Sequence, residues 1–235
     1  MRRESTDQIS FRRPLPVTVA PAPGENLNGY VRRLCALNGV SNLGLFRTAL
    51  HIGKLSSSTA DQRLWINLSA ASLQPLAAIK AMQWRKREDG FLLGIVDFQG
   101  YAIQKKFLRT SRLRICPLCI RETKIVRDTW SLLYMTACTI HSVDLVDSCD
   151  HCCNKNNTPT PLKYSSATLP WSCHCKRDLG EIGTVPASPE TLLVSLALEH
   201  AMASGLATEN QLPCSIFPEI AELPLNDLMT FIDIV

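Results

Sequence analysis

The sequence predicts a mostly α-helical protein with small ribbon-like β elements in its middle part. Apolar residues recur at helical spacing before residue 84 and again after residue 188. Between these stretches, residues 116–175 hold most of the ten cysteines. The predicted order is a flexible basic arm (1–23), an N-terminal helical domain (24–113), a cysteine-rich module (114–180) and a short acidic helical segment (181–235).

The first 23 residues are expected to form an extended arm. Several prolines disfavour a helix there, because proline lacks an amide hydrogen and restricts the residue before it. The arginines of this stretch fit either contacts to phosphate or a solvated tail. They are Arg2, Arg3, Arg12 and Arg13.

A pair of helices is predicted directly after the arm. The first covers residues 27–37, where Leu, Tyr and Val recur on one side and Asn38-Gly39 provides a helix end. The second covers residues 43–50 after a short turn, which gives the order of a helix-turn-helix. Arg47 of the second helix is then a candidate contact to nucleic acid. Packing of the two helices within the domain is the alternative interpretation.

Two more helices and a β-prone stretch complete the predicted N-terminal domain. The third helix is expected over residues 59–68. The fourth is expected over residues 73–84, with the cationic Arg85-Lys86-Arg87 at its C-terminal end. Residues 90–113 lose helical periodicity and favour strands, with glycines as breaks.

The C-terminal segment is predicted to be helical and acidic. Ser188-Pro189-Glu190 is typical of a helix start, and residues 224–234 favour a last short helix. Residues 186–235 contain acidic side chains and no Lys or Arg. The sequence ends in an apolar stretch, which fits either a piece of a longer protein or an end that docks on a partner.

Four short pairs of cysteine or histidine residues mark the cysteine-rich module. Each pair holds two ligands separated by one or two residues, so that a tight turn can direct both at one ion. Two pairs supply the four ligands of a tetrahedral zinc ion, and the sequence therefore predicts two structural Zn²⁺ sites with zinc-ribbon-like strands around them. The predicted ligands are Cys116, Cys119, Cys138 and His141 for one site, and Cys149, Cys152, Cys173 and Cys175 for the other.

The pairing of these ligands stays open in the sequence. The pairs can be used in order, or they can be cross-braced, with the first joined to the third and the second to the fourth. His174 can also replace one of its two neighbouring cysteines. The module is expected to bury little apolar surface on its own, so metal binding must supply much of its folding free energy. Cys35 and Cys214 have no ligand neighbours and are expected to be buried thiols.

The distribution of charge gives the candidate nucleic-acid contacts. Seven thiolates and two Zn²⁺ ions would change the formal net charge of +4 to about +1, so the overall charge does not indicate nucleic acid. Cations are concentrated just before the first ligand pair, where they can contact phosphate or balance the nearby thiolates. The candidates are Lys105, Lys106, Arg109, Arg112 and Arg114, together with Arg47.

Several classes of protein are disfavoured by the sequence. The N-terminus lacks the apolar core of a signal peptide, and no apolar run is long enough to cross a bilayer. The cysteines therefore indicate a cytoplasmic metal-binding protein, with reduced thiols, rather than a disulfide framework. No HExxH motif or Walker A loop is present, and four-ligand zinc sites leave no position for water. The chain is not expected to be an enzyme.

The motifs follow one another in a characteristic order. They begin at Pro21-x-Pro23-Gly24-Glu25-x-Leu27-x-x-Tyr30-x-x-Arg33-Leu34. They continue at Arg114-x-Cys116-Pro117-x-Cys119, Trp130, Cys138-x-x-His141-x-x-x-Leu145 and Cys149-x-x-Cys152. They close at Trp171-x-Cys173-x-Cys175-x-x-Asp178-Leu179. This ordered set resembles the TniQ family of transposition-targeting proteins, which includes the TnsD-type target selectors.

The resemblance implies an accessory protein of DNA transposition. Such a protein links target recognition, by DNA binding or through a CRISPR effector complex, to a TnsC-type AAA+ ATPase that recruits the transposase. The resemblance also implies zinc binding at the eight pair positions and no membrane partner, and it allows a homodimer. The alternative function is a transcription regulator that binds specific DNA through the helix-turn-helix and zinc fingers. A third alternative, a zinc hydrolase, would need a three-ligand site.

Overall fold

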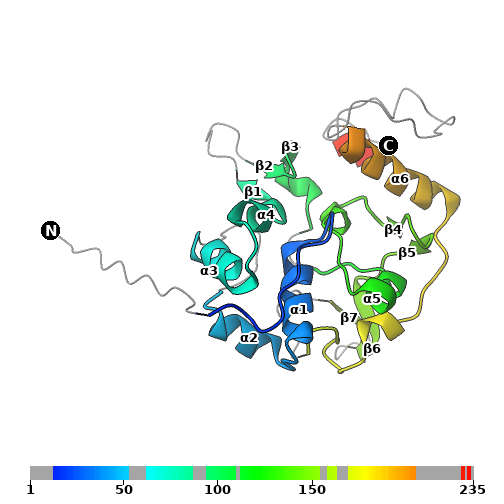
Figure 1. The fold of residues 1–235 in the computed structure, drawn as a ribbon. Coiled ribbons are helices and arrows are strands. Elements are labelled where there is room, and N and C mark those ends of the chain that lie inside the picture. The colour runs from blue at the N-terminus through cyan, green and yellow to red at the C-terminus, as the bar shows by residue number, and fades with distance from the viewer. Residues whose placement is uncertain are drawn as a thin grey trace.

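The computed structural model describes residues 13–52, 62–86, 94–109, 112–153, 158–162, 169–204, 229–230 and 232–233. Within this part of the chain, four helices come first, small antiparallel sheets and short helices follow, and a long helix comes near the end (Figure 1). This order confirms the predicted combination of helices with small strand pairs. The arm up to residue 12, Cys214 and most of the predicted last helix lie outside the described residues.

Four helices form the N-terminal part of the structure. They are α1 (Leu27–Leu37), α2 (Leu43–Ala49), α3 (Gln62–Ser72) and α4 (Leu76–Ala81). The first two begin at asparagine caps, because a side-chain oxygen can accept a hydrogen bond from a free amide of the first turn. Asn26 Oδ1 accepts from Gly29 N at 2.6 Å, and Asn42 caps α2 in the same way. The predicted pair of helices is confirmed, and its role as a helix-turn-helix stays a prediction.

The ends of α3 and α4 correct two predicted boundaries. α3 continues to Ser72, beyond the predicted end at residue 68, and Leu73 follows it with a φ of 57°. α4 ends at Ala81, so the predicted helix with a cationic end was wrong. Arg85–Lys86 instead form strand β1, paired with the strand that contains Asp97. Backbone hydrogen bonds to a distant strand fix this segment in an extended conformation that its local sequence does not predict.

Small antiparallel sheets follow α4. One has the order β1-β2-β3, with β2 at Ile95–Phe98 and β3 at Tyr101–Gln104. Two hairpins come later, β4 (Ala137–Cys138) with β5 (Val143–Asp144), and β6 (Ser148–Cys153) with β7 (Pro159–Pro161). Helix α5 (Pro117–Thr123) and the 3₁₀ helices η1 (Lys105–Phe107) and η2 (Thr129–Ser131) lie between these strands along the chain, and the 3₁₀ helix η3 (Leu179–Glu181) follows β7.

Helix α6 (Pro189–Ser204) packs on β4. Thr191 N donates to Ser188 Oγ at 3.2 Å, which confirms the predicted helix start. Ser195 is fully buried, and its Oγ accepts from Ala137 N at 3.1 Å. None of the helices in the described part of the chain is both long and apolar enough to cross a membrane.

Buried apolar residues form two cores. The first lies among α1 to α4 and includes Tyr30 and Leu34. The second joins the β1–β3 sheet, the cysteine-rich module and α6, and it includes the fully buried Trp130 and Leu132. That the cysteine-rich module buries little apolar surface on its own stays a prediction. The module shares its core with elements that precede and follow it in sequence.

The two cores are joined through α1, which lies between the other N-terminal helices and the hairpins (Figure 1). Asn26 N donates to Val126 O at 2.9 Å, and Asp128 N donates to Gly24 O at 2.9 Å. Arg32 Nη1 reaches across from α1 to donate to a carbonyl oxygen of the cysteine-rich module. The N-terminal helices and the cysteine-rich module therefore pack directly against each other.

We expect Gly29→Ala to destabilise the protein by about 1–3 kcal/mol, because overpacking forces neighbouring groups to move. A Cβ at Gly29 would lie 2.8 Å from Val126 Cβ and 3.2 Å from Val126 N. The better helix propensity of alanine, up to about 1 kcal/mol, does not offset this clash. Urea unfolding measures the change. Gly183→Ala is the control, since nothing lies within 4 Å of a Cβ there. Equal effects at the two glycines would contradict the close contact.

Candidate metal centres

The first cluster lies between α5 and the β4–β5 hairpin. Cys116 is the N-cap of α5, and its Sγ accepts from Cys119 N at 3.5 Å, which turns both thiols of this pair inward. Cys138 ends β4, and His141 follows in the turn before β5. His141 Nδ1 lies 3.3 Å from Cys119 Sγ and 3.5 Å from Cys116 Sγ. It also lies 3.7 Å from Cys138 Sγ.

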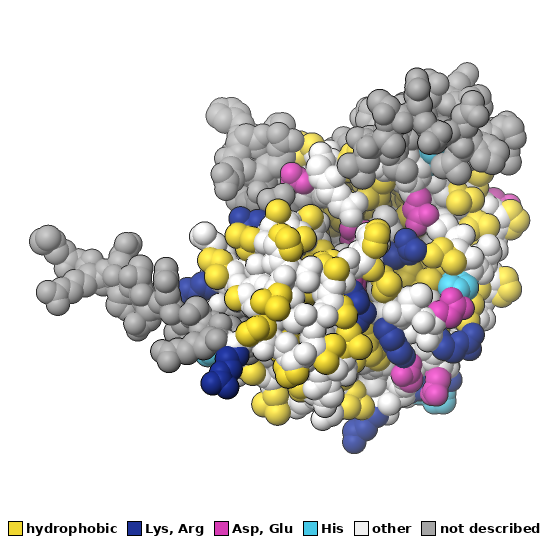
Figure 2. Space-filling model, in the orientation of Figure 1, with side chains coloured by type: hydrophobic (Ala, Val, Ile, Leu, Met, Phe, Trp, Pro, Cys, Tyr) yellow, Lys and Arg dark blue, Asp and Glu magenta, His cyan; other side chains and the backbone are white. Residues whose placement is uncertain are grey.

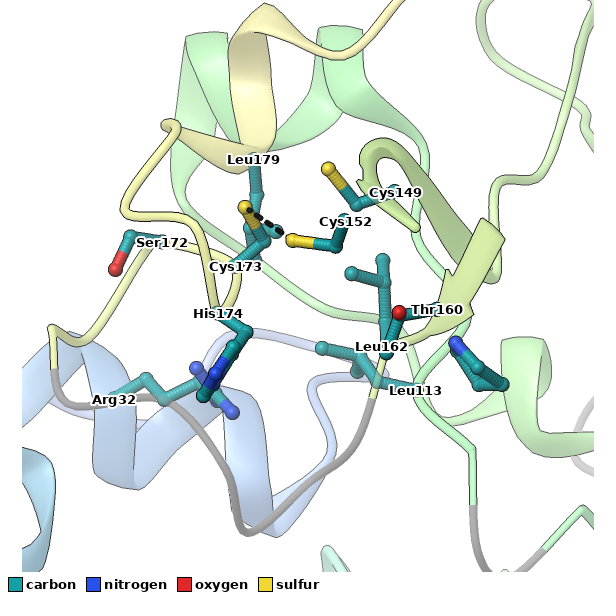
Figure 3. Close-up of a pocket in the computed structure, with 11 residues that line it drawn as sticks. Arg32, Leu113, Cys149, Cys152, Thr160, Leu162, Ser172, Cys173, His174 and Leu179 are labelled. Carbon is teal, nitrogen blue, oxygen red and sulfur yellow. Dashed lines mark hydrogen bonds between the residues drawn. The ribbon is translucent and has the colours of Figure 1, made fainter. Parts of the chain in front are cut away.

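The second cluster lies between β6 and the turn before η3. Cys149 and Cys152 lie on β6, whose pairing with β7 is irregular in this stretch. Cys173 and Cys175 lie in a tight turn that is closed by a hydrogen bond from Lys176 N to Cys173 O at 3.1 Å. Figure 3 shows Cys152 and Cys173 facing each other, with a sulfur separation of 3.7 Å. The sulfurs of Cys149 and Cys175 are 3.8 Å apart.

These separations fit tetrahedral coordination. In each cluster, one donor atom from each of the four residues lies within 4.8 Å of the other three. An ion bonded to sulfur at about 2.3 Å holds two tetrahedral sulfurs about 3.8 Å apart. The 3.0 Å between Cys173 Sγ and Cys175 Sγ is shorter than this, yet well above the ~2.0 Å of a disulfide. Both clusters can therefore hold a metal ion.

The structure also distinguishes the two possible pairings. It brings the first predicted pair to the second and the third to the fourth, which is the arrangement in order rather than the cross-braced one. His174 is exposed and is not among the four donors of the second cluster. His151, another histidine beside a ligand, also points away, with a side chain 63% exposed.

Crowding of the thiols changes their acidity. The contact with Cys116 is the main cause of the raised pKa of Cys119, whereas hydrogen bonds from Cys116 and Cys119 lower the pKa of Cys138. In the second cluster, a hydrogen bond from Cys173 lowers the pKa of Cys175 to about 7. One thiolate in each cluster is thus favoured while a neighbour is kept protonated. A bound divalent cation would remove this conflict by stabilising all the thiolates.

A carboxylate lies behind the histidine of the first cluster. His141 Nε2 lies 3.0 Å from Glu122 Oε2, while Nδ1 faces the thiols. Such a partner fixes the tautomer and the ring orientation of a metal-binding histidine. Glu122 was not among the residues predicted from the sequence, although its spacing of three residues from Cys119 places both on one side of α5 and was a usable signal.

We expect Glu122→Gln to weaken metal binding at one of the two clusters by about 10-fold or more, because the imidazole loses its charged partner. Competition with a chromogenic chelator measures the affinity of each of the two metal equivalents. Glu190→Gln, at an exposed position of α6, is the matched control. Identical chelator profiles for the two variants would contradict the proposed support of His141.

The candidate nucleic-acid contacts occupy different environments. Arg114 is 6% exposed, and its guanidinium donates to the carbonyl oxygens of Leu132, Leu133 and Met135. Its guanidinium is therefore hydrogen-bonded inside the fold and does not face solvent. Arg47 is half-buried, and burial lowers the pKa of its guanidinium.

The remaining candidates lie on η1 or just after it. Arg109 Nη1 is 2.9 Å from Asp147 Oδ2, and Lys106 Nζ is also paired with a carboxylate. Lys105 and Arg112 are exposed, and no acidic partner of either is found within the described ranges. On the face shown in Figure 2, basic and acidic side chains alternate over the half that carries α5. This face does not present one broad basic patch.

Asp128 is a buried carboxyl group in the segment that joins the two cores. It is 4% exposed, its Oδ1 accepts from Thr129 N at 2.7 Å, and no hydrogen bond to Oδ2 is found in the part of the chain described. Burial raises its pKa from 3.8 to about 7. As the pH rises, the unfolded chain therefore ionises first, and folding stability falls between about pH 4 and pH 7.

We expect Asp128→Asn to remove this fall in stability. The stability of the variant relative to the natural chain should increase by about 1–3 kcal/mol between pH 5 and pH 8. Urea unfolding of both proteins at pH 5 and at pH 8 measures this difference in stability. The thiols titrate in both proteins, so their contribution cancels when the two are compared at the same pH. A difference that does not change with pH would show that the carboxyl group ionises normally.

The fold and the two clusters define a class of protein. In this class, a helical part packs on a module that holds two candidate metal centres, each with four ligands. A family model described as TniQ matches residues 16–145, which is more than half of the 235 residues. The chain belongs to the TniQ family and is therefore a transposition-associated protein. The match includes the first cluster and ends before Cys149. The assignment of the second cluster as a candidate metal centre therefore depends only on its residues and their geometry. No curated protein matches the chain.

Proposed function

We propose that each cluster binds one structural Zn²⁺ ion. Three thiolates with one imidazole, or four thiolates, are the ligand sets of structural zinc. Four protein ligands complete the tetrahedron and leave no position for water or substrate, so each ion would supply folding free energy. The proposed ligands are Cys116, Cys119, Cys138 and His141 at the first centre, and Cys149, Cys152, Cys173 and Cys175 at the second.

The chain then acts as an adaptor in DNA transposition and not as an enzyme. Membership of the TniQ family is the observation that carries this proposal. The adaptor links target recognition, by DNA or through a CRISPR effector complex, to a TnsC-type AAA+ ATPase that recruits the transposase. Direct packing of α1 on the cysteine-rich module supports this role, because it joins the N-terminal helices and the two candidate metal centres in one unit.

Association with the ATPase tests the adaptor function. The purified, metal-loaded chain is expected to retain the ATPase from the same transposon in a pull-down that contains ATP and DNA. An AAA+ ATPase of an unrelated system is the control. Absence of association in every combination of ATP and DNA would overturn the proposal. Tight, sequence-selective binding of duplex DNA by the chain alone would instead favour the transcription regulator.

A further inference from the structure

An acidic residue of the C-terminal segment lies on the basic surface of η1. Lys106 Nζ is 2.7 Å from Asp233 Oδ2, and the Tyr134 hydroxyl donates to Asp233 Oδ1. The Tyr134 ring is 6.1 Å from the ring of Phe107, and Lys106 Nζ lies 4.6 Å above the Phe107 ring. One ammonium group and one hydroxyl group therefore converge on a single carboxylate beside two aromatic rings.

The carboxylate is held there by the residues around it. Met229 is fully buried in the second core, and Ile232 packs against the same core. Figure 1 shows this red C-terminal turn beside the end of α6. The hydrogen bonds from Lys106 and Tyr134 lower the pKa of Asp233, so it is ionised at neutral pH. The side chains of Lys106 and Asp233 are 54% and 40% exposed, and the pair is therefore open to competition from solvent-borne anions.

We propose that Lys106 and Tyr134 form a binding site for a nucleic-acid phosphate, and that Asp233 occupies this site in the free protein. This inference deepens the proposed function, on which it rests, by naming one contact to DNA and the group that competes with it. A phosphate accepts hydrogen bonds from ammonium and hydroxyl groups as a carboxylate does. Release of Asp233 would expose both donors at once.

Phosphate of a nucleic acid fits this surface better than an isolated anion. Lys105 precedes Lys106 on η1, and Arg112 follows nearby in the sequence, both with exposed side chains. A polyanion with regularly spaced phosphates can contact several such cations, and its affinity then depends strongly on salt. Asp233 is paired with only one of these cations, Lys106, so a polyanion that contacts several of them can displace it.

Binding of a short random-sequence DNA duplex to the full, metal-loaded chain tests the inference. We expect Asp233→Asn to tighten binding by about three- to fivefold, the strength of an exposed ion pair. Lys106→Gln should weaken binding by a similar factor. The double variant should bind only slightly better than Lys106→Gln, because the Tyr134 hydroxyl is then the one donor of the proposed site that Asp233 still covers. Glu181→Gln removes the same charge from an exposed position on η3 and is the matched control.

Each outcome is decisive for the site. An equal gain for Asp233→Asn and Glu181→Gln, an undiminished gain from Asp233→Asn in the double variant, or failure of every variant to bind the duplex would overturn it. A gain seen with a polyglutamate peptide and not with DNA would also overturn it, since the site would then take acidic protein. Association with the ATPase, measured in parallel, tests the adaptor function separately, because it can persist when the DNA site fails.

Discussion

Cys119→Ser is expected to release the metal from the first centre and to unfold the part of the chain packed around it. Cys119 is 5% exposed within the second core, and its Sγ lies 3.7 Å from Cys138 Sγ and 3.3 Å from His141 Nδ1. Structural zinc in small domains contributes an apparent ~10–16 kcal/mol, whereas whole domains have about 5–15 kcal/mol of net stability. Loss of one ligand therefore removes an amount comparable with the entire stability, even though apolar packing is also present.

Metal content and thermal unfolding measure this effect. The variant should retain about one metal equivalent in place of two, and its transition should move to much lower temperature. Cys35→Ser is the matched control, because Cys35 is fully buried outside both clusters and its thiol donates to Val40 O at 3.2 Å. Burial raises the Cys35 pKa to about 11, as expected for the predicted buried thiol. Two retained metal equivalents in Cys119→Ser would contradict the assignment of this ligand.

Local patterns predicted the features whose causes are local. The helix over residues 27–37 was predicted from its apolar residues and its end before Gly39, which has a φ of 67°. The sequence offered Glu25 or Asn26 as the cap, and the structure selects Asn26. The two metal clusters were predicted for a similar reason. Each ligand pair is a short turn, and the structure was needed for the choice between the two pairings and for the choice between His174 and its neighbouring cysteines.

Long-range contacts account for what the sequence could not predict. Arg114 and Lys106 look alike in a run of cations, yet one is buried against carbonyl oxygens and the other is on the surface. Asp233 meets Lys106 across more than half of the chain, and no local spacing indicates such a partner. The strand at Arg85–Lys86 likewise depends on pairing with a later strand. The chemistry of a side chain determines which kinds of group it can contact, but the fold determines which of those groups lies next to it.

Arg32→Met is expected to destabilise the protein by about 3–6 kcal/mol, because two acceptors lose hydrogen bonds from a charged donor worth about 1.5–3 kcal/mol each. Arg32 is 1% exposed on α1. Its Nε donates to Asn28 Oδ1 at 2.8 Å, and its Nη1 donates to Pro170 O at 2.6 Å. The second of these bonds joins α1 to the segment that leads into Cys173.

Arg32 also lines the cavity beside the second cluster. This cavity of about 290 Å³ is bordered by Arg32, Cys149, Cys152 and Cys173 (Figure 3). A Zn²⁺ ion with four thiolates would carry a net charge of about −2, which the guanidinium that lines the same cavity would help to stabilise. The variant should therefore lose metal faster from the second cluster than from the first.

Urea unfolding and metal release to a chelator separate the two roles of Arg32. Arg121→Met removes an exposed arginine from α5 and should leave both measurements unchanged. Arg32→Lys keeps the positive charge but loses the planar group that bonds two acceptors. Compared with Arg32→Met, it should therefore recover more of the metal retention than of the stability. If Arg32→Met lowers stability while both metals leave at their original rates, the arginine only anchors α1. If neither measurement changes, the buried contact to Pro170 is absent in solution.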